Sequence, residues 1–239
     1  MKHIYNLIGA NSNIAKYLFN ELKNKDFKVN KFTHSDENTF ENFEINSTNS
    51  HINIYFSIIR DDINSSINHL KKYLNISVKN NSKFFYISSI NAKFPNSSFY
   101  SKIKYECEKI VREKNGTIIR LGLVISDNPF GPYKSLINLA NLPVNFIFSK
   151  DSKVITTNIK KFLDFNFENS NNSLYELFCD VYFLNEFIAQ KRINKIRLNI
   201  NLANILKFLF FINNFFYLKG ILGRILTLTC IKNLKKTYL

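Results

Sequence analysis

Two hydrophobic periods alternate along most of this chain, and their alternation is the feature that most limits its fold. Short runs of nearly continuous apolar residues, typical of strands buried on both faces, are separated by segments with the apolar spacing of amphipathic helices. The apolar runs are "HIYNLI", "FKVNKFT", "INIYFSII", "KFFYISSI" and "TIIRLGLVI". The helical segments are "NIAKYLFNELKNK", "INSSINHLKKYLNISVKN" and "SFYSKIKYECEKIVREK". This order predicts an α/β fold, a doubly wound parallel sheet with helices on both faces.

The regular alternation stops after Ile125, where "SDNPFGPYKSLINLANLPVN" is rich in turn residues. Beyond it, "KVITTNIKKFLDF" predicts a strand and a helix, and "SLYELFCDVYFLNEFIAQ" predicts a strand leading into a helix, so we expect the chain to return to the sheet. We therefore predict one sheet domain over residues 1–190, with an excursion over 126–152, and a small helical region over 191–239. A chain of 239 residues, 45% of them hydrophobic, can bury such a core.

Composition narrows the classes of partner. The net charge of +15 would normally indicate an acidic partner such as nucleic acid, an anionic membrane or a phosphorylated ligand. The lysines are scattered, however, so a solvated basic surface is favoured and no nucleic-acid partner is predicted. Three widely spaced cysteines predict neither a disulfide framework nor a metal site. The first residues lack the apolar stretch of a signal peptide, which favours the cytoplasm.

One apolar segment, Ala203 to Ile231, has some features of a membrane helix. A spanning helix needs about 20 mostly apolar residues, and Lys207, Lys219 and Arg224 interrupt this segment. Two short helices broken near Gly220 and packed on the protein are therefore favoured, while an interfacial membrane helix stays open.

Ligands of an open parallel sheet bind at the carboxyl ends of its strands, and polar residues that could act together on one substrate occur there in this sequence. Ser89 ends the strand "FFYISS", and Tyr100 and Lys104 lie four positions apart, on one face of the next helix. An ammonium near a phenol favours its ionised form, so the pair can exchange a proton with a substrate hydroxyl or carbonyl. Ser89 would hold the same oxygen by a hydrogen bond. We predict that these residues form a catalytic group.

The turn "GANSNIA", Gly9 to Ala15, joins the first strand to the first helix as a phosphate-binding turn does, but with one glycine where three are usual. Alanine at position 15 is a mild change, since the third glycine serves close helix packing. Ser12 stands where the backbone approaches a pyrophosphate, so its side chain either obstructs the phosphate or binds it. The predicted cofactor contacts in this turn are Gly9, Asn11, Ser12, Asn13 and Ile14.

Together, these motifs resemble the extended short-chain dehydrogenase/reductases, specifically the NAD(P)-dependent nucleotide-sugar epimerase/dehydratase group. In that family a helix reading "Y-x-x-S-K-x-x-x-E" precedes a strand reading roughly "I-x-R-x-G-x-V". The first pattern is matched by Tyr100, Lys104 and Glu108, with Ile103 in place of the serine. The second is matched by Ile118, Arg120, Gly122 and Val124. The likeness continues weakly through "VITTNIKKFL", which resembles the segment that rejoins the sheet, and through "LGRILTLTCIKNLKKTYL".

This resemblance implies a Rossmann-type domain that binds NAD or NADP, with the pyrophosphate at the helix N-terminus after Gly9, and hydride transfer at a sugar carbon. Tyr100 would be the acid/base, Lys104 would bind the nicotinamide ribose and lower the pKa of the tyrosine, and Ser89 would position the sugar oxygen. His34 stands near the end of the second strand, where an acidic residue would hold the ribose of NAD, which slightly favours NADP.

The resemblance favours an epimerase or 4-keto reductase, hence an isomerase or oxidoreductase, acting on a nucleotide-activated sugar in cell-surface polysaccharide biosynthesis. The oligomeric state is left open, with a homodimer as one candidate. Ser12 and the short loops around the predicted site favour an alternative, a cofactor-binding regulatory or scaffolding protein of the same fold without catalysis. A basic peripheral membrane protein, held through residues 203–231, is a third hypothesis.

Overall fold

The computed structural model of the chain describes residues 3–33, 40, 50–56, 62–141, 144–147, 152–191 and 198–201. The chain forms two compact units, which are described one at a time. The first comprises residues 1–121 and 159–177, and the second comprises 122–158 and 178–239. Residues 178–190 thus group with the second unit, whereas the sequence placed them in the sheet domain. Most of 191–239 lies outside the described residues, so the proposed boundary at 190 stays a prediction.

The first unit is built on a six-stranded sheet with the order β2-β1-β3-β4-β5-β9, in which every neighbouring pair is parallel. Its strands are β1 (Ile4–Ile8), β2 (Lys28–Phe32), β3 (His51–Tyr55), β4 (Lys83–Ser89), β5 (Thr117–Leu121) and β9 (Leu174–Leu177). The central strands β1 and β3 are buried at every position, which accounts for their continuous apolar character. The predicted α/β class, with a Rossmann-like parallel sheet, is confirmed.

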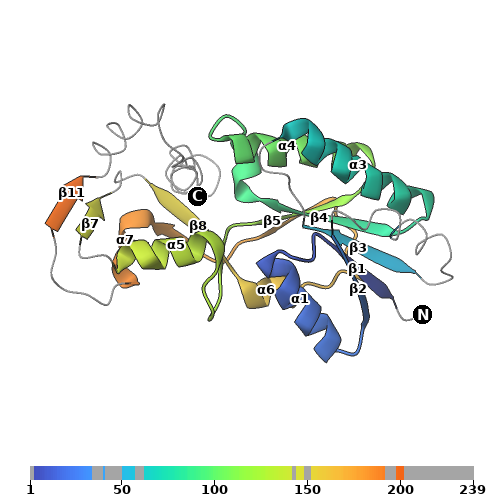
Figure 1. Cartoon of the computed structure of the whole chain (residues 1–239), viewed down its shortest axis with the longest axis horizontal. Coiled ribbons are helices and arrows are strands. Elements are labelled where there is room, and N and C mark those ends of the chain that lie inside the picture. Colours follow the sequence, from blue (N-terminus) through green and yellow to red (C-terminus); the bar gives the residue numbers. More distant parts are fainter. Residues whose placement is uncertain are drawn as a thin grey trace. The chain divides into compact units, whose positions relative to one another are not determined.

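Helices cover both faces of this sheet (Figure 1). On one face lie α3 (Ile63–Lys79) and α4 (Phe99–Glu113), and on the other lie α1 (Asn13–Asn24) and the short α6 (Ile159–Leu163). The core beneath α3 and α4 is rich in aromatic side chains and includes Tyr55, Tyr73, Phe84, Tyr86 and Ile103.

The sequence sets the starting points of the three long helices through capping side chains. A side-chain oxygen accepts a hydrogen bond from an amide of the first turn in each case, and this satisfies one donor that the helix leaves unpaired. The capping residues are Ser12 for α1, Asp62 for α3 and Ser98 for α4.

A cluster of aromatic rings fills part of the α1/α6 face, where α6 is only one turn long. After α6, Phe165 and Phe167 pack edge-to-face against Phe85 of β4, with ring centroids 6.3 and 5.2 Å away. Tyr5 donates a hydrogen bond to Glu168 at 3.2 Å, which ties this segment to β1. These rings cover part of the sheet face that carries α1 and α6, where a longer helix would otherwise pack.

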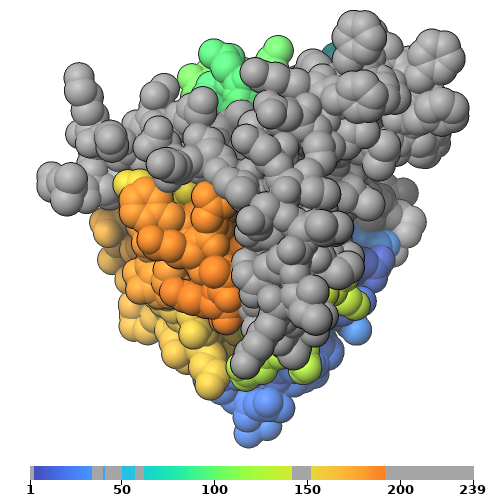
Figure 2. Space-filling view, turned by 90° about the vertical axis from the view of Figure 1, so that its left-hand side faces the viewer, coloured from blue at the N-terminus to red at the C-terminus, as the bar shows by residue number. Residues whose placement is uncertain are grey.

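The second unit has its own small sheet and core. A three-stranded sheet has the order β10-β8-β6, and β7 pairs with β11 in a separate parallel pair. The elements are β6 (Leu123–Ile125), α5 (Gly131–Ala140), β7 (Val144–Ile147), β8 (Lys153–Asn158), β10 (Val181–Phe183), α7 (Leu184–Gln190) and β11 (Leu198–Asn201). Leu136, Val154, Leu184 and Phe187 lie in its core. The orange segment in Figure 2, which contains α7, lies at the surface of this unit.

Two strand predictions were wrong. The run "TIIRLGLVI" is not one strand: it divides at Gly122 into β5 of the large sheet and β6 of the small one. The segment "VITTNIKKFL" does not rejoin the large sheet, because β8 pairs with β6 and β10 instead; β9 is the strand that rejoins it. The turn-rich region after Ile125 also contains a helix, α5, which begins with Gly131 and Pro132.

Two predictions fall on residues that the structure does not describe. His34, assigned to the cofactor ribose, is one, and the apolar segment 203–231 is the other. Among the described residues, no helix combines the length and apolar character that a membrane span requires.

We predict that Gly122→Ala lowers the free energy of unfolding by about 2–3 kcal/mol, because a Cβ at this position would lie 2.4 Å from the backbone oxygen of Ile155. Gly116→Ala is the comparison, since its Cβ would meet a side-chain atom, the Val111 Cγ1 at 2.8 Å, while the nearest backbone atom, the Val111 oxygen, lies 3.4 Å away. Urea denaturation measures both. Equal stability of the two variants would show that β6 and β8 do not need this close approach.

Candidate functional site

The three predicted catalytic residues lie at the carboxyl edge of the first unit's sheet. Ser89 is the last residue of β4 and caps the short 3-10 helix η1 (Ile90–Lys93), accepting a hydrogen bond from the Asn91 amide at 3.3 Å. The Ser98 hydroxyl accepts from the Ser101 amide at 3.1 Å and so starts α4 just before Tyr100. Strand end and helix start therefore bring all three predicted residues to this edge.

Tyr100 and Lys104 differ sharply in exposure. Tyr100 is 37% exposed, whereas Lys104, one turn further along α4, is 4% exposed. The Lys104 Nζ donates a hydrogen bond to the Ile87 carbonyl of β4 at 2.7 Å and lies 6.0 Å from the centroid of the Tyr100 ring. A buried ammonium is thus held close to a phenol that a substrate can reach.

Lys104 is buried without an ion-pair partner. Among the described residues, no carboxylate oxygen lies within 4.0 Å of its Nζ. Burial lowers the pKa of Lys104 to about 8, and the neighbouring Cys107 and Glu108 oppose that shift only in part. A pKa depressed from 10.5 to about 8 corresponds to about 3 kcal/mol of disfavoured charge at neutral pH. Folding alone does not explain a lysine here.

One helical turn beyond Lys104, Glu108 forms a fully bonded ion pair with Arg120 of β5. The carboxylate accepts from the Arg120 Nε at 2.9 Å and from its Nη2 at 2.6 Å, and it also accepts from the Ser88 hydroxyl at 2.7 Å. Glu108 is 2% exposed and Arg120 is 8% exposed. This pair fixes α4 to β4 and β5 close to the predicted catalytic residues, because each charge would be costly alone.

The same guanidinium reaches a second carboxylate. Arg120 Nη1 donates to Glu176 of β9 at 3.0 Å, and Glu176 pairs with Lys93 of η1 at 2.8 Å. The chain of charges thus connects the helix that carries Tyr100 with the turn that follows Ser89. Sequence reasoning did not find Glu176, because β9 lies more than fifty positions along the chain from Arg120.

The turn after β1 has the backbone geometry of an anion site. Gly9 has a φ of 79°, which favours glycine, and it lets the chain turn directly into α1. The amides of Asn11, Asn13 and Ile14 bond to no acceptor within the described residues. The Ser12 hydroxyl instead accepts from the Ala15 amide at 3.2 Å, so it caps its own helix. Neither sequence alternative foresaw this bond.

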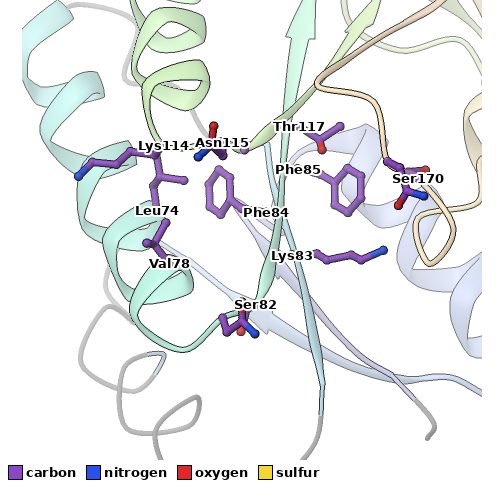
Figure 3. A pocket seen from close by; sticks show the side chains of 13 residues that line it. Leu74, Val78, Ser82, Lys83, Phe84, Phe85, Lys114, Asn115, Thr117 and Ser170 are labelled. Carbon is purple, nitrogen blue, oxygen red and sulfur yellow. The ribbon is translucent and has the colours of Figure 1, made fainter.

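A hollow of about 290 Å³ lies at the opposite edge of the sheet, between the amino ends of β4 and β5 (Figure 3). Phe84 and Phe85 line it from β4, and Lys114 points away from them (Figure 3). Lys83 donates to the Glu168 carbonyl. This hollow contains no acid–base pair and is separate from the Tyr100 edge. Across the described part of the chain, no three His, Cys, Asp or Glu side chains gather as a metal ion would require.

Comparisons with known proteins find the fold but no close relative. No protein-family model matches the chain, and no curated protein sequence matches it. Among solved structures, a dTDP-4-dehydrorhamnose reductase from Clostridium acetobutylicum superposes with a TM-score of 0.67 at 14% identity, covering 83% of this chain and 84% of its own. The Bacillus anthracis dTDP-4-dehydrorhamnose reductase in complex with NADP gives 0.66 at 15% identity, covering 84% and 85%.

A third match is an Agrobacterium tumefaciens short-chain dehydrogenase/reductase superfamily protein with bound NAD. Its TM-score is 0.63 at 10% identity, covering 83% of this chain and 85% of its own. The resemblance inferred from the motifs is therefore confirmed at the level of the fold, over most of the chain. Identities of 10–15% establish a shared architecture and leave the activity to the site itself.

We predict that Lys104→Met raises the free energy of unfolding at pH 7 by about 1–3 kcal/mol, because it removes an ammonium buried without a carboxylate partner. The pKa of Lys104 is lower in the folded chain than in the unfolded one, so the unfolded state binds the extra proton between about pH 8 and 10.5. The free energy of unfolding of the wild type therefore rises relative to that of the variant as the pH rises through this window. Urea denaturation at pH 7, 8.5 and 9.5 checks both points; a destabilised variant with a constant gap would contradict them.

Proposed function

We propose that this protein is an NAD(P)-dependent reductase or epimerase of a nucleotide-activated sugar, with Tyr100 as its acid/base. The observation that carries this proposal is Lys104, an ammonium buried beside an accessible phenol, with no carboxylate oxygen of the described residues within 4.0 Å of its Nζ. Such an arrangement costs stability and is useful where a tyrosine must ionise near neutral pH. The shared fold with NADP- and NAD-bound proteins supports the same proposal.

The turn after β1 fits the pyrophosphate of a dinucleotide. Free amides at Asn13 and Ile14, at the positive end of the α1 dipole, would hold one phosphate, and the Asn11 amide would add a donor. The bound nicotinamide would supply or accept a hydride at a sugar carbon. Lys104 still has N–H groups beyond the one bonded to Ile87, and these would bind the nicotinamide ribose.

The chain's own residues would then manage the substrate oxygen. Tyr100 would give its phenolic proton to a developing alkoxide, or take one from a hydroxyl in the reverse direction. The Lys104 charge would stabilise the phenolate that remains. Ser89 would donate its hydroxyl hydrogen to the same oxygen, since its lone pair already serves the Asn91 amide. These roles are consistent with the positions of all three residues at one edge.

The decisive experiment separates this proposal from a cofactor-binding protein without catalysis. The purified full-length chain is mixed with NAD, NADP and their reduced forms, and thermal unfolding is followed; a ligand at 100 times its Kd stabilises by about 2.7 kcal/mol. A panel of UDP-, GDP- and dTDP-sugars, including 4-keto forms, is then assayed by nicotinamide absorbance and product analysis. Stabilisation without turnover would favour the scaffolding alternative. The absence of both stabilisation and turnover would overturn the proposal.

We predict that Tyr100→Phe lowers kcat about 100-fold or more and leaves the Kd for the dinucleotide within about twofold, because the phenol moves a proton and does not bind the cofactor. Tyr105→Phe, on the same helix, is the control; its ring is half-buried and lies 4.9 Å from the Lys109 Nζ. Steady-state kinetics and calorimetric titration measure the two quantities. Unchanged turnover in the Tyr100 variant would remove the catalytic assignment.

We predict that Ser12→Gly tightens dinucleotide binding about three- to tenfold. The substitution frees the Ala15 amide and removes a side chain from the phosphate position, while glycine at a helix cap costs only a few tenths of a kcal/mol. Ser12→Ala is the paired variant, which also frees the amide but keeps the Cβ. Calorimetric titration with NADP and NAD compares the three chains. Weaker binding in both variants would mean that the Ser12 hydroxyl itself contacts the phosphate.

A further inference from the structure

Lys104 has a second aromatic neighbour that the proposed reaction does not use. Strand β4 alternates, so Phe84, Tyr86 and Ser88 share the face covered by α3 and α4. The Tyr86 side chain is fully buried, and its ring centroid lies 4.6 Å from the Lys104 Nζ, closer than the 6.0 Å to the Tyr100 ring. Both distances are within the range of a cation–π interaction.

Few other groups offset the Lys104 charge. From α4 the titratable neighbours are Tyr100, Cys107 and Glu108, and from β4 the neighbour is Tyr86. Glu108 accepts hydrogen bonds from Arg120 of β5 and from the Ser88 hydroxyl, so its charge is largely neutralised by Arg120. What remains beside the ammonium is the Ile87 carbonyl and the negative face of the Tyr86 ring.

The surroundings of the Tyr86 hydroxyl indicate that the ring, and not the hydroxyl, is the functional part of this side chain. Its oxygen is buried and has no nitrogen or oxygen partner among the described residues; the polar group beside it is the Cys107 thiol of α4. Burial raises the pKa of this phenol, together with the adjacent Cys107 thiol, so it stays neutral. A buried hydroxyl whose neighbour is a weakly bonding thiol adds little stability, whereas an aromatic face near a desolvated cation is attractive. Packing alone would be served by a leucine.

We propose that Tyr86 is a positioning residue for the catalytic pair: its ring face keeps Lys104 charged and in place beside Tyr100. This inference rests on the proposed function, in which Lys104 acts only while it is protonated. It concerns the protein without cofactor or substrate, and it can therefore be tested separately. Loss of the ring should shift the protonation equilibrium of Lys104 by about tenfold, one pKa unit downward.

The test measures the Lys104 pKa directly in the full chain without ligands. Lysines labelled with ¹³C at the ε-carbon are titrated by NMR, and Lys104→Met assigns the signal. Tyr86→Phe, which keeps the ring, should leave the pKa within about 0.3 units; Tyr86→Leu should lower it by about one unit. Tyr105→Leu, which removes the half-buried ring beside Lys109, is the control and should leave the pKa of Lys104 unchanged.

A second series keeps the test sharp if the leucine variant does not fold. Phenylalanine with increasing fluorination at position 86 weakens the negative ring face with little change in shape, so the Lys104 pKa should fall step by step. A flat response across this series, or a phenylalanine variant that shifts as far as leucine, would overturn the inference. If the NMR shifts appear but no dinucleotide binds, the proposed function fails while the Tyr86–Lys104 interaction stands. If turnover is found, the alkaline limb of its pH profile should move to lower pH in the leucine variant.

Discussion

The ion pair between Glu108 and Arg120 is the interaction on which the site depends. It joins the middle of α4 to β5 in a buried environment. The carboxylate also accepts a hydrogen bond from Ser88 on β4, and the guanidinium also donates one to Glu176 on β9. A bidentate guanidinium–carboxylate pair has a fixed geometry, so it sets both the rotation and the height of α4 above the sheet. Tyr100 and Lys104 lie on that helix, and their positions at the sheet edge follow from this bond.

The same helix buries a second charge in a different way. Glu108 has every partner it needs, whereas Lys104 has one backbone carbonyl and two tyrosine rings. The first arrangement makes the fold specific; the second weakens it, because a desolvated ammonium without a counter-ion is disfavoured. Of these two buried charges one helical turn apart, Glu108 serves the fold and Lys104 serves the proposed chemistry.

Local patterns predicted most of the first unit correctly. Continuous apolar runs identified the strands because both faces of a parallel sheet are buried, and the apolar spacing of the segments between them identified the amphipathic helices. The spacing of Tyr100 and Lys104 predicted their shared face, since helix geometry is local. The same reasoning failed at Gly122, where an apolar run spans two sheets: strand propensity is continuous there, and only the approach of the Ile155 carbonyl shows the break.

The sequence by itself determined the α/β class, the succession of strands and helices in the first unit, and the shared face of Tyr100 and Lys104, because each depends on residues within one or two turns of each other. Only the tertiary structure decided that Glu176 joins the charge network from a distant strand and that Tyr86 lies against the Lys104 ammonium. These contacts depend on which strands become neighbours and how deeply each side chain is buried. Burial also decides how much a charge costs, and that cost is what distinguishes Lys104 from the many lysines on the surface.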